Sequence, residues 1–99
     1  MGKRVVIWSH KATIRLFEIL DFYTKRNKSK SYSKKLYAKL QKQTKLLVTQ
    51  PEIGVLTDFE SIRGLNIDNF ILFYEITQEK IIVHSIWDCR QNPDTIKIK

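Results

Sequence analysis

The chain has 99 residues, which is the size of one small domain. Hydrophobic residues make up 42% of it, so it can bury a core, and a wholly disordered protein is excluded. The 18 Lys and Arg outnumber the 10 Asp and Glu, giving a net charge of +8 that indicates acidic or polyanionic partners.

Cysteine and histidine are too sparse for a disulfide framework or a structural metal site. Cys89 is the single cysteine, which excludes an internal disulfide and fits a cytoplasmic protein. His10 and His84 do not have metal-ligand spacing, and the three glycines form no phosphate-binding loop. We therefore expect no metal and no cofactor. No apolar run is long enough to span a bilayer, so we expect no membrane association.

The first half of the chain predicts one strand and two helices. Residues 3–8 are β-branched and aromatic, which is typical of a strand, and Ser9 is a good helix N-cap. Apolar residues then recur at helical spacing over residues 10–26 and again over 31–49. Pro51 and Gly54 end the second helix. Two helices joined by a short polar break predict an antiparallel hairpin.

The second half of the chain predicts three strands, over residues 61–67, 70–76 and 80–87. Short polar turns separate them, which is typical of a meander. The polar tail from Gln91 is expected to be loose. We predict a single α+β domain over residues 1–99 in the order β-α-α-β-β-β, with an antiparallel sheet and the helical hairpin on one of its faces.

Basic residues are concentrated in one block. Residues 22–51 contain nine Lys or Arg and no acid. Five lysines of the second helix project within an arc of roughly 140°, opposite its leucines: Lys34, Lys35, Lys39, Lys42 and Lys45. This pattern is typical either of a solvated helix face or of a surface for nucleic acid or an acidic protein. Neighbouring lysines without Glu partners are mildly destabilising, which supports the second interpretation.

Two residues of the predicted sheet, Arg63 and His84, and one residue just past it, Arg90, are candidates for chemistry. Arg63 and Arg90 carry guanidinium groups suited to phosphate, but for Arg63 the pattern favours an ion pair with an acid such as Glu75 or Asp88. His84 is either a hydrogen-bonded core residue or, facing a groove, a general base.

The strand register decides which face each candidate occupies. A two-residue turn at Asp68-Asn69 predicts Arg63 opposite Tyr74. Val83 and Trp87 are then expected on that same face, and His84 on the other face with Phe73 and Ile86.

Three apolar residues of the first helix lie off its main stripe: Ile14, Phe17 and Phe22. They either pack against the second helix or form an exposed patch, and such patches mark protein partners.

Several segments follow one another at a specific spacing from about residue 4 to 93. They are the strand ending in Trp8-Ser9, the helix with Ala12, Leu16, Ile19 and Tyr23, the turn Pro51-Glu52-Ile53-Gly54, the strands Ile62-Arg63-Gly64-Leu65 and Asn69 to Glu75, and the segment Ile81 to Pro93. The order and spacing of these segments, more than any single motif, resemble the RelE/ParE superfamily of bacterial toxins.

The resemblance implies the toxin of a type II toxin–antitoxin module, complexed by an antitoxin whose toxin-binding segment is usually acidic. Its ParE-like branch poisons DNA gyrase and is not an enzyme. Its RelE-like branch cleaves ribosome-bound mRNA without a metal. By position, Arg63 and Arg90 match family arginines that stabilise phosphate charge in that branch, with His84 as a substitute base.

Two features of the chain favour the ParE-like branch. Many nuclease members have a His or Tyr near the C-terminal arginine, whereas this chain has Asp88 and no His or Tyr after position 84. The long helices and the Pro51–Gly54 turn also look ParE-like. We therefore expect a gyrase-directed toxin. The alternatives are a ribosome-dependent endoribonuclease and a non-toxic basic module that binds RNA or the ribosome.

Overall fold

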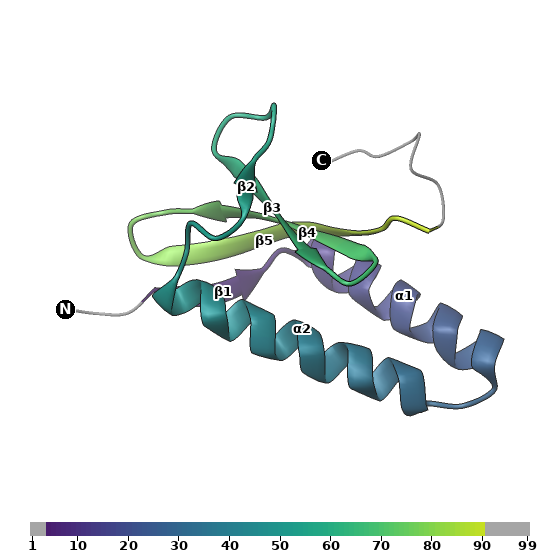
Figure 1. The fold of residues 1–99 in the computed structure, drawn as a ribbon. Coiled ribbons are helices and arrows are strands. Elements are labelled where there is room, and N and C mark those ends of the chain that lie inside the picture. Colours follow the sequence, from purple (N-terminus) through teal and green to yellow (C-terminus); the bar gives the residue numbers. More distant parts are fainter. Residues whose placement is uncertain (1–3, 91–99) are drawn as a thin grey trace.

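The computed structural model describes residues 4–90 (Figure 1). The elements in order are β1 (Val5–Trp8), α1 (His10–Asn27), α2 (Ser31–Thr49), β2 (Val55–Leu56), β3 (Ile62–Ile67), β4 (Phe70–Ile76) and β5 (Lys80–Asp88). The predicted α+β class and the predicted helical hairpin are confirmed. The expectation of a loose tail from Gln91 lies outside the described residues.

The helices begin and end where local chemistry places them. The Ser9 hydroxyl accepts a hydrogen bond from the Ala12 amide at 3.0 Å and so caps α1. Lys28 adopts a left-handed conformation with φ of 52° and closes α1 through its amide, which bonds to the Lys25 carbonyl. The helix α2 ends at Thr49 because Pro51 follows two residues later.

The sheet has five strands in the order β1-β5-β4-β3-β2. The strands β2 to β5 form an antiparallel meander, but β1 pairs parallel with β5, with Val6 opposite Ile81. The expectation of a wholly antiparallel sheet is therefore wrong at this edge. The hairpin carries the chain across one face to the far edge, and the meander then returns beside β1. The two-residue strand β2 was not predicted.

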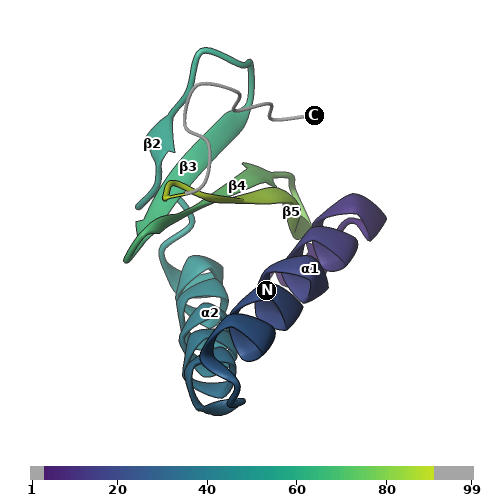
Figure 2. The same ribbon diagram turned by 90° about the vertical axis from the view of Figure 1, so that its right-hand side faces the viewer.

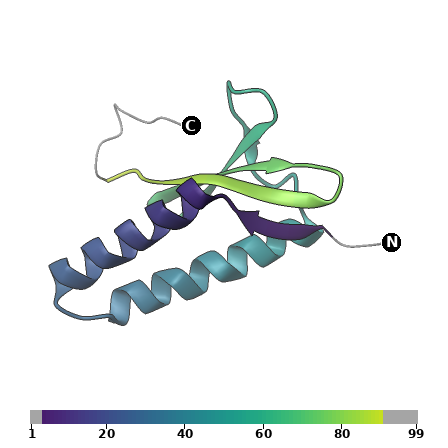
Figure 3. The ribbon, with the colours of Figure 1, turned by 180° about the vertical axis from the view of Figure 1, so that it is seen from behind.

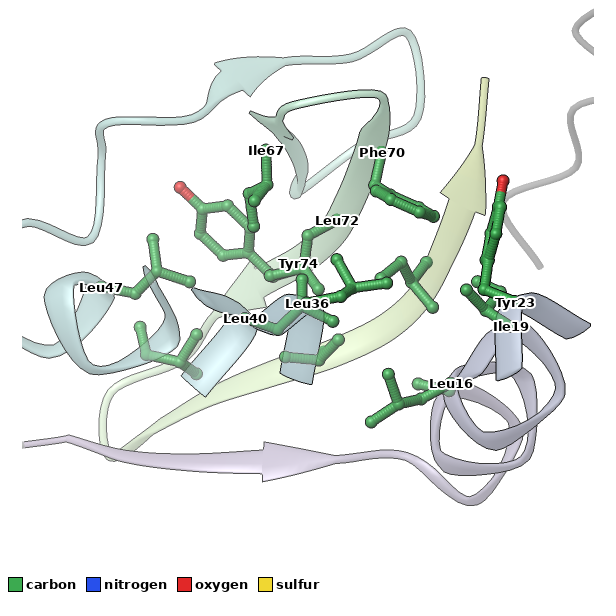
Figure 4. Close-up of a cluster of buried hydrophobic side chains, with 14 residues drawn as sticks. Leu16, Ile19, Tyr23, Leu36, Leu40, Leu47, Ile67, Phe70, Leu72 and Tyr74 are labelled. Atoms are coloured by element: carbon green, nitrogen blue, oxygen red, sulfur yellow. The ribbon is translucent and has the colours of Figure 1, made fainter. Parts of the chain in front are cut away.

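Both helices lie against the same face of the sheet (Figure 2), and the view from behind shows α1 and α2 running side by side (Figure 3). Their leucines and isoleucines meet the inner residues of the central strands β4 and β5. Figure 4 shows this core, in which Leu40, Leu47, Leu72 and Tyr74 are fully buried. The face of the sheet opposite the helices has no helix over it among the described residues.

A β-bulge in β5 changes which of its residues face the helices. Tyr74 pairs with Val83 but Phe73 pairs with Ser85, so His84 is an extra residue. The predicted register of Arg63, Tyr74 and Val83 is confirmed.

The predictions for Trp87 and Ile86 are wrong, because the bulge reverses the alternation beyond it. Ile86 pairs with Leu72 and is buried under the helices. Trp87 pairs with Ile71 on the opposite face.

Candidate functional site

Arg63 is a residue of β3 that lies beside the C-terminal end of α2. There it holds the loop that leads from α2 into β2. Its Nη1 donates to the Gly54 carbonyl at 2.8 Å and, more weakly, to the Glu52 carbonyl at 3.4 Å. Beside it, the Tyr74 hydroxyl donates to the Pro51 carbonyl at 2.7 Å and accepts from the Gly54 amide at 2.9 Å. The expected ion pair of Arg63 with Glu75 or Asp88 is not formed. Arg63 binds backbone carbonyls instead.

Arg90 lies at the other end of the hairpin, in a network centred on Asp88. The Asp88 carboxylate is fully buried and accepts from the Arg90 amide at 2.9 Å, from Arg90 Nε at 3.4 Å and from the Tyr23 hydroxyl. Arg90 Nη2 donates to the Tyr32 hydroxyl at 3.1 Å. The guanidinium also lies 4.8 Å from the centre of the Tyr23 ring, within cation–π range.

The network shifts the protonation equilibria of its members. Burial raises the pKa of Tyr23 to about 12, and the hydrogen bond to Asp88 adds to the shift because it favours the protonated phenol. The pKa of Arg90 is also raised, since the hydrogen bond to Tyr32 and the nearby oxygens outweigh the opposing effect of burial. Tyr23 is therefore a proton-bearing donor at neutral pH and Arg90 a fixed cation.

The two arginines do not converge on one ligand. Arg90 contacts Tyr32 in the first turn of α2, whereas Arg63 contacts the loop that follows its last turn. A helix of 19 residues is about 28 Å long. That distance is several times the size of a phosphate group, so the two guanidinium groups belong to separate sites.

His84 lies away from both arginines, on the sheet face opposite the helices. Its Nε2 lies 2.8 Å from the Glu75 carboxylate, and both side chains are about one-third exposed. The histidine is hydrogen-bonded, as one interpretation expected, but it is not in the core. It lines a cavity of about 560 Å³ with Ser9, Lys11, Phe59, Glu60 and Ile62.

The five predicted lysines of α2 are all exposed along one side of the helix. Lys39 forms an ion pair with Asp68 in the β3–β4 turn, at 2.7 Å. Within residues 4–90, Lys34, Lys35, Lys42 and Lys45 make no ion pair. The expectation that these lysines lack acidic partners is therefore wrong at Lys39. Its partner Asp68 is 29 positions away in the chain, so local sequence spacing does not reveal the ion pair.

The three apolar residues of α1 are exposed: Ile14 by 47%, Phe17 by 58% and Phe22 by 41%. Each of them therefore leaves about half of its surface exposed, as the interpretation of an exposed apolar patch expected, and buries the rest. Phe17 and Leu20 line an apolar groove of about 350 Å³ between the helices, together with Ser33 and Tyr37 of α2. Lys30 and Lys34 border this groove.

The sequence did not point to the Asp88 network or to the clamp of Tyr74 on the 51–54 loop. Both join residues far apart in the chain, and Tyr23 and Asp88 are separated by 65 positions. The sequence did contain one signal for the network: Asp88 directly follows the apolar residues of the last predicted strand and precedes Arg90 by two positions. Among residues 4–90, no cluster of three metal-ligating side chains occurs, and no helix is long and apolar enough to cross a membrane.

A family model for the ParE toxin of the type II toxin–antitoxin system parDE matches residues 6–93. The chain therefore belongs to the ParE toxin family, and it is the toxin component of a type II toxin–antitoxin system.

A solved structure of the chromosomal ParDE toxin–antitoxin system from P. aeruginosa has the same fold. The TM-score is 0.73 at 20% sequence identity, over 85% of this chain and 94% of that one. No curated protein matches the sequence.

Proposed function

We propose that this toxin arrests growth by binding and poisoning DNA gyrase in the cytoplasm, and that it does not cleave RNA. The observation that carries the proposal is the separation of Arg63, Arg90 and His84. The two arginines lie at opposite ends of α2, and His84 lies on the other face of the sheet.

Metal-independent RNA cleavage needs several groups around one phosphate. A base must reach the attacking 2′-hydroxyl, an acid must reach the leaving oxygen, and a cation must stabilise the charge that develops. At Arg63 the nearest polar partners are backbone carbonyls and the Tyr74 hydroxyl, whose pKa is raised by burial. Neither provides a base at neutral pH, which favours a toxin that acts by binding.

The experiment compares the two outcomes in the same cells. Induced expression of the full chain should stop growth with intact mRNA, double-strand breaks and an SOS response, and the purified toxin should trap gyrase–DNA cleavage complexes. Arrest with cleaved mRNA and unaffected gyrase would refute the proposal. Normal growth upon induction would refute a toxic activity of any kind for this chain.

The cognate antitoxin is the second part of the proposal. We infer that its toxin-binding segment docks on the exposed apolar residues of α1, over the groove that Phe17 and Tyr37 line. An amphipathic helix with acidic flanks fits this surface, because its apolar face would cover Phe17 and its acids would meet Lys30 and Lys34.

The docking surface is tested with one pair of variants. Phe17→Ser should weaken antitoxin binding by at least tenfold, since aromatic anchors contribute most of the binding energy. Ile53→Ser is the control, because Ile53 is also exposed, by 37%, but lies in the loop after α2. Equal affinities for the two variants, measured by calorimetry, would place the antitoxin elsewhere.

One observation favours the alternative of a ribosome-dependent endoribonuclease. Arg90 and Arg26 line a cavity of about 500 Å³ with Tyr23, Tyr32 and Phe22, which combines cations with aromatic rings as RNA-binding sites do. If this site cleaved mRNA, Arg90→Ala would abolish cleavage and restore growth. Arg63→Ala would also abolish cleavage only if Arg63 took part in the same reaction.

A further inference from the structure

The charges of this toxin are divided between its two layers. Residues 10–50, which include both helices, contain 11 Lys or Arg and two acids. Residues 51–90, which include β2 to β5, contain three Lys or Arg and seven acids. The net charge of +8 is therefore concentrated on the hairpin, while the meander is acidic.

On the hairpin, the lysines of α2 form a continuous row on its outer side. The five lysines lie opposite the buried Leu36, Leu40 and Leu47, so their ammonium groups point away from the core. Ala38 is exposed in the middle of the row. Its small side chain leaves room for a partner to approach the helix closely.

We propose that the lysine row of α2 binds the phosphate backbone of duplex DNA. This assignment goes beyond gyrase poisoning, because it gives the toxin a contact of its own with DNA that does not require gyrase.

The spacing of the lysines suits a repeating polyanion. The row from Lys34 to Lys45 extends about 16 Å along the helix axis at about 1.5 Å per residue. Each strand of DNA presents one phosphate per about 3.4 Å of duplex axis, so about five phosphates of one strand lie within that length. Several lysines can therefore contact separate phosphates at the same time.

The composition of the row favours nucleic acid over an acidic protein. The cores of protein–protein interfaces are depleted in lysine and contain aromatic or apolar anchors. Within the row only Leu46 is apolar and large, and it is 37% exposed at one end. The apolar residues of the hairpin lie instead on α1 and at Tyr37, in a groove that meets the row at Lys34.

The row also favours a duplex over a single strand. Proteins that bind single-stranded nucleic acid stack its bases on aromatic side chains. No aromatic residue lies among Lys35, Ala38, Lys42 and Lys45, because Tyr32 lines the cavity beside Arg90 and Tyr37 lines the groove toward α1, which meets the row at Lys34. Contacts to phosphate alone are what this surface offers.

Titration of a fluorescent 20-base-pair DNA duplex with the purified full chain, between 50 and 200 mM salt, tests the proposal. The triple variant K35Q/K42Q/K45Q removes three cations that make no ion pair in the described structure, at little cost in helix propensity. K11Q/K25Q/K80Q removes the same charge from exposed lysines outside the row and is the matched control.

The slope of log affinity against log salt should fall by about 2.7 for K35Q/K42Q/K45Q, at about 0.9 per lysine. At 0.1 M salt this corresponds to about a 500-fold loss of affinity. The control should lose less than about tenfold. Circular dichroism and thermal melting establish that both variants are folded.

Three results would overturn the proposal. Equal losses in the two triple variants would show attraction by net charge without a defined surface. Tighter binding of duplex RNA, or of a polyglutamate of equal charge, would assign the row to RNA or to an acidic protein.

Discussion

The two ends of α2 are fastened to the sheet in different ways. At the C-terminal end, Arg63 and the Tyr74 hydroxyl hold backbone groups of the 51–54 loop. At the N-terminal end, a buried carboxylate, Asp88, joins β5 to α1 through Tyr23 and orients Arg90 toward Tyr32. Each end places an arginine beside a tyrosine, but only the second contains an acidic side chain that is fully buried.

The difference indicates which arginine is available for a ligand. The Arg63 side chain is committed to a loop and fixes local geometry. Arg90 lies on aromatic rings at the wall of an open cavity and presents part of its guanidinium to solvent, with 40% of its side chain exposed. A search for functional residues in this toxin should therefore begin at the Arg90 end, and the two ends should also respond differently to mutation and pH.

The largest effect is expected at the Arg90 end. Asp88→Ala removes the acceptor for the Tyr23 hydroxyl and for Arg90, and it should lower the free energy of unfolding by about 3 kcal/mol. Urea denaturation measures this change. Asp21→Ala is the control, since its ion pair with Lys25 is exposed and should contribute less than about 1 kcal/mol. Similar losses of unfolding free energy in both variants would contradict the interpretation that Asp88 holds this network together.

The next effect is expected at the Arg63 end, where Gly54 touches Tyr74. A Cβ atom at position 54 would lie 2.6 Å from the Tyr74 hydroxyl oxygen and 3.0 Å from the Gly64 carbonyl. Gly54→Ala should therefore cost about 1–3 kcal/mol, because the buried tyrosine has to move. Gly64→Ala is a matched control whose nearest neighbour, an Ile71 methyl, is 3.3 Å away. A larger loss for Gly64→Ala would be inconsistent with the clamp.

Alkaline pH should loosen the Arg90 end. The pKa of Tyr23 is about 12 in the fold and 10.0 otherwise, so the folded state holds this proton more tightly. Stability is fully present below pH 10 and is lost as pH rises toward 12, by on the order of 2 kcal/mol. Thermal melting between pH 9 and about 12 should show a shallower loss for Tyr23→Phe than for the parent. Tyr37→Phe, at an exposed position, should leave the slope unchanged.

The smallest effect is expected for Arg63 itself. Arg63→Ala removes hydrogen bonds to two carbonyls that water can reach in part, so it should destabilise the fold by about 1 kcal/mol. The same variant should retain toxicity if Arg63 has only the role of holding the loop. Full loss of toxicity in a folded Arg63→Ala protein would show that the arginine acts on the target.

Composition and periodicity were sufficient to predict the helices and four of the five strands from the sequence. The leucines of α2 repeat at helical spacing over 19 residues, and Ser9 and Pro51 mark the ends of the hairpin. The pattern could not reveal that β1 pairs parallel with β5, because hydrophobic alternation is the same in parallel and antiparallel edge strands. The two residues of β2 are too few to form any pattern.

The candidate sites were less predictable than the fold. The exposed lysines of α2 and the exposed apolar residues of α1 follow from helix geometry, and they are where the sequence predicted them. The partners of Arg63 are backbone carbonyls, which every residue has, so no side-chain pattern identifies them. The faces of Trp87 and Ile86 were misassigned because a single extra residue at His84 leaves no trace in hydrophobicity.

The pairing of β1 with β5 joins the first and the last strand of the described residues. Val5 to Trp8 find their partners at Lys80 to Val83, so about three-quarters of the polypeptide separates the two strands. A nascent chain cannot complete this sheet until β5 has left the ribosome, and contacts this distant in sequence form slowly. A polypeptide interrupted before residue 80 has neither the strand that β1 pairs with nor much of the surface that α1 covers. Synthesis of this toxin should therefore yield either a complete fold or none.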